Sequence, residues 1–227
     1  MRTDQERQQI QTKLFAGEGG FSLIEILVVI TLIGLLMGFA VLALGGHSEA
    51  GREADCRARI EALSLMIESH EDRTGGYPPS RLADLGVEDA NDVNEGVEAM
   101  TAALRHRDYA GRRPDERWLG NVDDDRSDLM RSADGSNALL EVVDPWDNPF
   151  FYIVSDAYGS SSVVRLDLGG GGEDVDAYAV KNPLTGAFHR FDSFQIRSAG
   201  ADGVLDTEDD LANFEIDVDG LSAADRR

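Results

Sequence analysis

The chain begins its hydrophobic pattern with one long apolar run close to its N-terminus. Residues 26–46 form a stretch of 21 positions without a charged side chain, and about 20 apolar residues are enough for a helix to cross a bilayer. A single carboxylate, Glu25, lies at the edge of this run. An ionisable group at such a position is costly and is therefore a candidate functional residue. We predict one membrane-spanning helix that has Glu25 near its start.

A second pattern, with helical spacing, follows the apolar run. Its apolar side chains are spaced by four, three and four residues, which places them on one face of a helix. They are Cys56, Ile60, Leu63 and Ile67. The glycine pair at residues 75–76 and the following Pro78 favour a helix end. One continuous helix is therefore predicted over about residues 21–72, and its second half is expected to pack against a globular domain.

The last third of the chain has the pattern of β-strands. Residues 150–154 are aromatic and β-branched, and apolar and polar residues alternate around 164–168 and 194–196. Two prolines fix a turn within residues 144–149. The glycines at 169–172 and the acids that follow them are interpreted as a turn and a flexible acidic loop. The expected fold class is α+β, with a long N-terminal helix packed on one small antiparallel sheet.

A long, polar and acidic stretch separates the helix from these strands. Residues 88–140 contain a predicted short helix at 97–105 and a predicted loop at 115–135. We interpret this stretch as a surface-exposed insertion that contacts neighbouring molecules. Its acidic run, residues 123–128, lacks the glycine and the distal glutamate of an EF-hand. The run is therefore expected to be a solvated loop.

Charge and composition narrow the function classes. The formal net charge is −22, which argues against nucleic acid as a partner because phosphate binding needs clustered basic residues. The single cysteine, Cys56, excludes an intramolecular disulfide and is interpreted as a helix-face residue. The four histidines are scattered, with no zinc or nucleophile spacing. No catalytic activity is expected.

Residues 19–30, with the sequence GGFSLIEILVVI, closely resemble the N-terminal signal of type IV prepilins and type II secretion pseudopilins. The resemblance implies that a prepilin peptidase cleaves between Gly20 and Phe21 and that the new amine of Phe21 is methylated. It also implies that Glu25 attracts the amine of a neighbouring subunit during assembly, because opposite charges interact strongly in low dielectric. Two alternatives remain. Glu25 could only complement the helix dipole, or the segment could be an ordinary secretory signal that is cleaved behind its apolar core.

Three later segments resemble the major pseudopilin of type II secretion. They are the Gly-Tyr-Pro element at 76–78, the DPWDNP turn at 144–149 and the acidic loop at 197–211. For the acidic loop, the resemblance implies a calcium site whose ligands are three side-chain carboxylates and two backbone carbonyls. The carboxylates are Asp202, Asp209 and Asp210, and the carbonyls are those of Ala199 and Val204. The alternative is an acidic loop without a metal.

The resemblance thus implies a pilin-like subunit of a type II secretion filament. The expected segments are the leader 1–20, the transmembrane and filament-core helix 21–46, the amphipathic continuation 47–74, the loop and acidic insertion 75–143, the sheet with its calcium loop 144–215, and the tail 216–227. The expected location is the inner membrane, with a cytoplasmic N-terminus and an extracytoplasmic domain. Expected partners are further copies, prepilin peptidase, other pseudopilins and secretion-platform proteins. A type IV pilin, a minor pseudopilin, or a membrane-anchored calcium-binding domain that does not polymerise remain alternatives.

Overall fold

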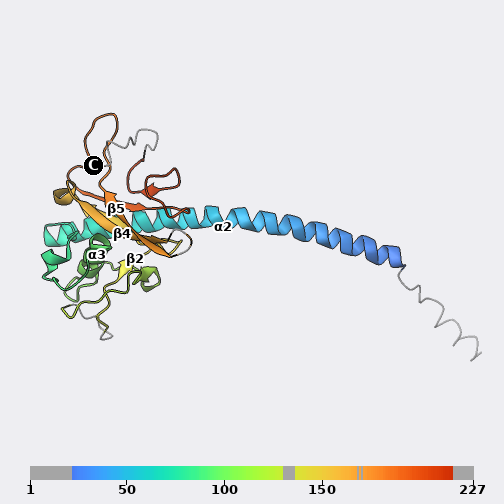
Figure 1. The fold of residues 1–227 in the computed structure, drawn as a ribbon, viewed down its shortest axis with the longest axis horizontal. Coiled ribbons are helices and arrows are strands. Elements are labelled where there is room, and N and C mark those ends of the chain that lie inside the picture. Colours follow the sequence, from blue (N-terminus) through green and yellow to red (C-terminus); the bar gives the residue numbers. More distant parts are fainter. Residues whose placement is uncertain (1–21, 130–135, 168, 170, 217–227) are drawn as a thin grey trace, which may run out of the picture. The chain divides into compact units, whose positions relative to one another are not determined.

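The computed structural model describes residues 22–129, 136–167, 169 and 171–216, without the side chains of residues 38–48 (Figure 1). The chain divides into two compact units between Ser48 and Glu49. Helix α2 (Leu23–Thr74) supplies the described part of the first unit and continues into the second. The predicted leader, the junction residues Gly20 and Phe21, and most of the predicted tail lie outside the described residues.

Helix α2 confirms the prediction of one continuous helix. It ends at Thr74, where Gly75 has a φ of 84° and its N–H donates to the carbonyl of Glu71 at 2.8 Å. A left-handed glycine is a favoured helix end because it carries no Cβ. The predicted apolar face is also confirmed, since all four of its side chains are buried: Cys56, Ile60, Leu63 and Ile67.

The membrane segment is only partly covered by the structure. Within the part of the chain that the structure describes, no helix has both the length and the apolar character needed to cross a membrane. The predicted span, residues 26–46, includes residues 38–46, whose side chains are not described.

The strands form three small antiparallel sheets in the described residues, whereas one sheet was expected. Strand β3 (Phe151–Val154) pairs with β6 (Phe194–Ser198), and β6 pairs with β7 (Leu211–Ala212). Strand β4 (Ser161–Asp167) pairs with β5 (Gly172–Tyr178), and β1 (Leu119–Gly120) pairs with β2 (Glu141–Val142). Short 3-10 helices occupy Leu82–Leu85, Glu116–Trp118 and Ser155–Ala157. The strands predicted around 150–154, 164–168 and 194–196 correspond to β3, β4 and β6, although Leu168 lies outside the described residues.

Strand β5 corrects the interpretation of residues 173–176 as a flexible acidic loop. These residues pair with residues 163–166 of β4, with Asp174 opposite Arg165. The Arg165 Nε atom donates to Asp174 Oδ1 at 2.7 Å. Cross-strand pairing of opposite charges favours a strand even where the sequence is acidic.

The main core lies between the second half of α2, sheet β3–β6–β7 and helix α3 (Glu95–Arg105). Phe150, Tyr152, Phe194 and Ile196 pack against the buried face of α2. The Tyr152 hydroxyl donates to the carbonyl of Pro78 at 2.7 Å, which fixes the segment that follows the helix.

Helix α3 shows that the interpretation of residues 88–140 as a surface insertion was wrong for residues 95–105. The helix was predicted, but eight of its eleven residues are buried, and Val97, Met100 and Leu104 belong to the main core. Gly96 approaches the backbone carbonyl of Tyr152 so closely that a Cβ would clash with it. The helix therefore packs directly on β3, and Figure 1 shows it beside β2 and β4. The burial could not be predicted from the polarity of the segment because α3 packs on two sides, with Val97 and Met100 in the main core and Ala99 in a smaller cluster with Leu82.

Candidate assembly and calcium sites

Ser22 and Glu25 cap each other at the start of α2. The backbone N–H of Ser22 donates to Glu25 Oε2 at 2.8 Å, and the backbone N–H of Glu25 donates to Ser22 Oγ at 3.3 Å. This reciprocal pair is a capping box, which satisfies two N–H groups at a helix start. Glu25 therefore has a local structural role within a single chain. The Ser-x-x-Glu spacing is a sequence signal for this role, which was not predicted; the predicted roles of Glu25 were attraction of a neighbouring subunit's amine and, as the alternative, interaction with the helix dipole.

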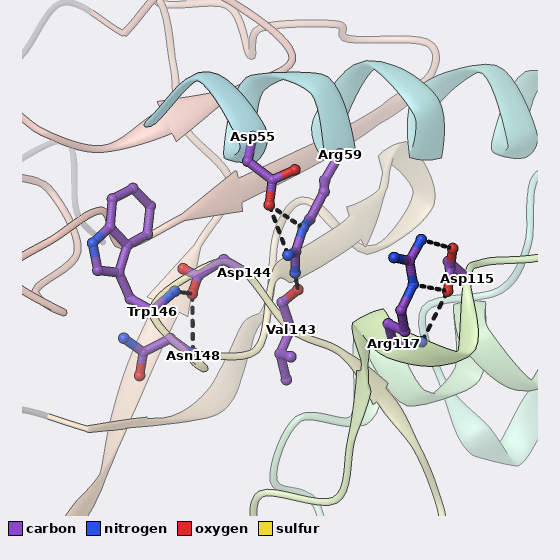
Figure 2. Close-up of polar contacts among 8 residues, drawn as sticks. All are labelled: Asp55, Arg59, Asp115, Arg117, Val143, Asp144, Trp146 and Asn148. Carbon is purple, nitrogen blue, oxygen red and sulfur yellow. Dashed lines mark hydrogen bonds and ion pairs between the residues drawn. The ribbon is translucent and has the colours of Figure 1, made fainter. Parts of the chain in front are cut away.

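The turn at residues 144–149 is organised by one buried carboxylate. Asp144 Oδ1 accepts hydrogen bonds from the backbone N–H groups of Trp146 at 2.9 Å and Asn148 at 3.0 Å (Figure 2). Asp144 Oδ2 accepts from the hydroxyl of Ser198 in β6 at 2.6 Å. Burial raises the pKa of Asp144, and these hydrogen bonds oppose the shift. The turn was predicted from its prolines, but the sequence analysis missed its link to the strand that leads into the acidic loop.

The same turn is attached to the second half of α2. Arg59 donates to Asp55 Oδ2 at 2.7 Å and to the carbonyl of Val143 at 2.9 Å (Figure 2). The indole Nε1 of Trp146 donates to Glu49 Oε1 at 2.8 Å. Helix, turn and β6 thus form one hydrogen-bonded frame at the base of the acidic loop.

The acidic loop between β6 and β7 is ordered by its own carboxylates. Asp209 Oδ2 accepts from the backbone N–H groups of Ala201 at 2.6 Å and Asp202 at 2.9 Å, and Asp209 Oδ1 accepts from Thr207 Oγ1 at 2.6 Å. Asp202 Oδ1 accepts from the N–H of Val204 at 2.8 Å. Burial opposes ionisation of Asp209, but the hydrogen bonds outweigh it and lower the pKa of this carboxyl. Asp209 is therefore a charged centre around which the loop backbone folds.

Asp210 faces a buried arginine that the sequence analysis did not single out. Arg197 is 1% exposed, and its Nη1 atom lies 2.9 Å from Asp206 Oδ1 and 3.9 Å from Asp210 Oδ2. Asp210 Oδ2 also accepts from the N–H of Asp206 at 2.8 Å, whereas Asp210 Oδ1 is buried without a hydrogen-bond partner. Burial raises the pKa of Asp210 to about 7, although Arg197 lowers it. Arg197, near the end of β6, thus places a positive charge beside the loop.

The five predicted calcium ligands share this loop but do not form a compact set of carboxylates. Val204 is exposed, and its carbonyl accepts from Thr207 Oγ1 at 3.1 Å, whereas Ala199 is buried. In the described residues, only one group of three acidic or metal-ligating side chains has ligand atoms within 4.8 Å of one another, and it lies elsewhere. The calcium assignment to Asp202, Asp209 and Asp210 therefore stays a prediction.

Comparison with known proteins covers most of the chain. Residues 16–41 match the prokaryotic N-terminal methylation motif. The chain is 24% identical to type II secretion system core protein G of Pseudomonas aeruginosa over 162 residues, which cover 70% of this chain and 92% of the relative. It is 36% identical to the protein of that name from Xanthomonas campestris pv. campestris over 70 residues, which cover 31% of this chain and 48% of the relative. No solved structure was found to match the chain. The motif and both similarities relate the chain to type II secretion system core protein G.

Proposed function

We propose that the protein is a structural subunit of a type II secretion pseudopilus, which polymerises into a helical filament to drive protein export. The observation that carries this proposal is the similarity to core protein G over 70% of the chain, together with the methylation motif. The motif alone fits pilins and pseudopilins equally, whereas the longer similarity favours the pseudopilin. The proposed role is structural and not catalytic.

Processing and location follow from the same proposal. Prepilin peptidase cleaves the precursor between Gly20 and Phe21, and the amine of Phe21 is methylated. Before assembly, residues 21–46 anchor the subunit in the inner membrane, with the leader in the cytoplasm and the remaining chain outside it. Its partners are further copies, other pseudopilins and the secretion platform.

Glu25 has two separable roles in this proposal. Ser22 and Glu25 both follow the proposed cleavage junction, so the capping box is kept in the processed chain. In the filament, the charge of Glu25 also neutralises the amine of Phe21 on a neighbouring subunit. Glutamine can close a capping box as glutamate does. Glu25→Gln therefore removes the charge and keeps the cap, whereas Glu25→Ala removes both.

We expect both variants to be cleaved and methylated but to form few filaments, because each lacks the charge that compensates the amine. Glu25→Ala should also lose about 0.3–1.5 kcal/mol of helix-start stability. N-terminal mass spectrometry measures processing, and sedimentation of sheared filaments measures assembly. Glu88→Gln removes an exposed charge from the second unit and serves as the matched control.

Two results would contradict the proposal in different ways. Normal filament yield from Glu25→Gln would show that the cap alone is sufficient. A wild-type chain with an intact leader, or with a new N-terminus behind residue 46, would contradict the assignment as a pseudopilin.

We also propose that the loop at residues 199–210 binds calcium through Asp202, Asp209 and Asp210 with the carbonyls of Ala199 and Val204. The resemblance of the loop supports this proposal, as do its folded carboxylates and the buried Asp210 Oδ1 atom without a hydrogen-bond partner. Calcium takes six to eight oxygen ligands, which a loop with backbone carbonyls can supply. Arg197 is the feature that opposes the proposal, because it already offsets part of the negative charge.

A further inference from the structure

A second acidic cluster lies within the segment that the sequence analysis interpreted as a surface insertion. Glu98 comes from α3, Asp123 from the loop after β1, and Glu141 from β2. One carboxylate oxygen from each lies within 4.8 Å of the other two. Asp125 from the same loop is the strongest charge acting on Glu98. We call these four residues the α3 cluster.

Glu98 is the most unusual member of the α3 cluster. Its side chain is 1% exposed, yet neither of its carboxylate oxygens has a hydrogen-bond partner. Burying a charged group without a partner is so costly that proteins pair it, neutralise it or coordinate it to a metal. A bare glutamate at this position therefore points to a missing positive species.

The surrounding oxygen atoms show the same deficiency. Four more buried oxygens nearby have no hydrogen-bond partner: Asp123 Oδ1, Asp125 Oδ1, Asp125 Oδ2 and Asn121 Oδ1. Most buried side-chain polar atoms in native proteins are hydrogen-bonded. Six such atoms, counting those of Glu98, are thus concentrated in one region. When the carboxyl groups are ionised, all six can only accept a hydrogen bond or bind a cation.

The strongest charges around Glu98 are all acidic. The charges that act most strongly on it are those of Asp125, Glu141 and Asp123, all of them negative. Arg165, whose charge reaches Asp123, is paired with Asp174 at 2.7 Å. Burial and these neighbours raise the pKa of Glu98 to about 10, and burial raises that of Glu141 to about 8.

Hydrogen bonds to other atoms of the cluster fix its side chains in position. Asn94 Nδ2 donates to Glu141 Oε1 at 3.0 Å, and Asn91 Nδ2 donates to Asp123 Oδ2 at 3.0 Å. Asn121 Nδ2 donates to the carbonyl of Asp125 at 3.0 Å, which leaves its own Oδ1 as a further acceptor. Outer partners of this kind orient the ligands of metal sites.

We propose that Glu98, Asp123, Asp125 and Glu141, with the amide oxygen of Asn121, bind one calcium ion. The available ligands are oxygens only, without sulfur or imidazole, which favours a hard cation. Calcium accepts six to eight oxygens, including bidentate carboxylates, whereas magnesium demands a tighter octahedral shell and keeps several waters. The ion would connect α3, the loop after β1, and β2. This site is separate from the loop at 199–210 and does not rest on the proposed secretion function.

The competing explanation for these oxygens without partners is a bound proton. Glu98 and Asp125 can share one proton, which would neutralise part of the cluster without a metal. Glu98→Gln separates the two explanations because the amide has the shape of a protonated glutamate and carries no charge. If a proton fills the site, the substitution leaves calcium binding unchanged.

The test uses the full chain in detergent, stripped with chelator and titrated with calcium chloride near pH 7. Native mass spectrometry counts bound ions, and titration calorimetry measures affinity. Glu98→Gln should lose one calcium equivalent relative to the wild type, or weaken its binding by at least about tenfold, since the number of ligand charges tunes calcium affinity. The same loss should occur in an Asp209→Asn background, which separates this site from the loop at 199–210.

Asp124→Asn is the matched control. Asp124 belongs to the same acidic run but is exposed and has a φ of 60°, which asparagine tolerates. This variant should keep the full calcium stoichiometry. If circular dichroism shows that Glu98→Gln is misfolded, Asp125→Asn replaces it and should show the same loss.

Two outcomes would overturn the proposal. One is an unchanged number and affinity of calcium ions in folded Glu98→Gln, which would assign the cluster to a bound proton. The other is magnesium binding as tight as calcium binding at the site lost in Glu98→Gln.

Discussion

The loop at 199–210 and the α3 cluster are both acidic, but they satisfy their carboxylates in opposite ways. In the loop, backbone N–H groups, Thr207 and Arg197 donate to the acids. In the α3 cluster, Glu98 and Asp125 have buried oxygens without a hydrogen-bond donor. The loop can therefore hold its fold without a metal, whereas the cluster needs a proton or a cation.

This difference shows that acid content alone is a poor indicator of a metal site. The loop has a motif that the sequence can reveal, yet the structure places a positive charge beside it. The cluster has no motif and collects its ligands from three separate elements. Donor groups around each carboxylate, more than the number of acids, decide where a cation is required.

The largest expected effect is that of Arg197→Met, which removes the positive charge beside the loop. It removes a charged partner of Asp206 and of the buried Asp210, and breaking a buried ion pair typically costs about 3–5 kcal/mol. Urea denaturation in chelator measures the free energy of unfolding. Arg165→Met removes an arginine from the half-exposed pair with Asp174 and should cost only about 0–1 kcal/mol. Equal losses of unfolding free energy in both variants would contradict the conclusion that Arg197 stabilises the loop by offsetting part of its negative charge.

Asp209→Ala is expected to have an intermediate effect. It removes the acceptor for the N–H groups of Ala201 and Asp202. Both residues are exposed, so water can replace the lost acceptor, and the expected cost is that of a typical hydrogen bond, about 0.5–1.5 kcal/mol. If the loop also binds calcium, this variant loses the calcium-dependent rise in Tm, which follows RT ln(1 + [L]/Kd). Differential scanning calorimetry in a Glu98→Gln background measures this response without a contribution from the α3 cluster.

Glu208→Ala is the matched control for Asp209→Ala, because Glu208 is an exposed acid next to it. The free energy of unfolding of Glu208→Ala should stay within about 0.5 kcal/mol of the wild-type value. A calcium response that persists in Asp209→Ala, with the α3 cluster disabled, would contradict calcium binding by the loop.

The smallest expected effect concerns Cys56 at the base of the loop. Burial raises the pKa of its thiol to about 12, although Ser198 opposes the shift. Because the thiolate is the reactive form, alkylation near pH 8 should be slow until the protein unfolds. Chelator should leave the alkylation rate unchanged, since the Asp144–Ser198 hydrogen bond joins the turn at 144–149 to β6 without a metal. Mass spectrometry of the alkylated chain measures the rate. Faster alkylation in chelator would show that a bound ion also stabilises the packing around Cys56.

Much of the architecture could be predicted because it depends on local patterns. The period of the apolar residues predicted α2 and its buried face, and Gly75 before Pro78 predicted its end. The aromatic and β-branched run predicted β3. The methylation motif is likewise continuous in the sequence, so its match at residues 16–41 confirmed the expected resemblance.

The sequence by itself thus determined the long helix, the main strands and the resemblance to a pseudopilin, because each is encoded by neighbouring residues. Only the tertiary structure decided that α3 is part of the core, that Arg197 offsets part of the charge of the loop, and that Glu98 lies near Glu141. These features join residues that are far apart along the chain, and their energies depend on burial and on which donors lie nearby. The sequence of a polar, acidic stretch shows neither its burial nor its donors. The free energy of an ionised carboxylate is low in water and high in a core, so it is decided only when the chain has folded.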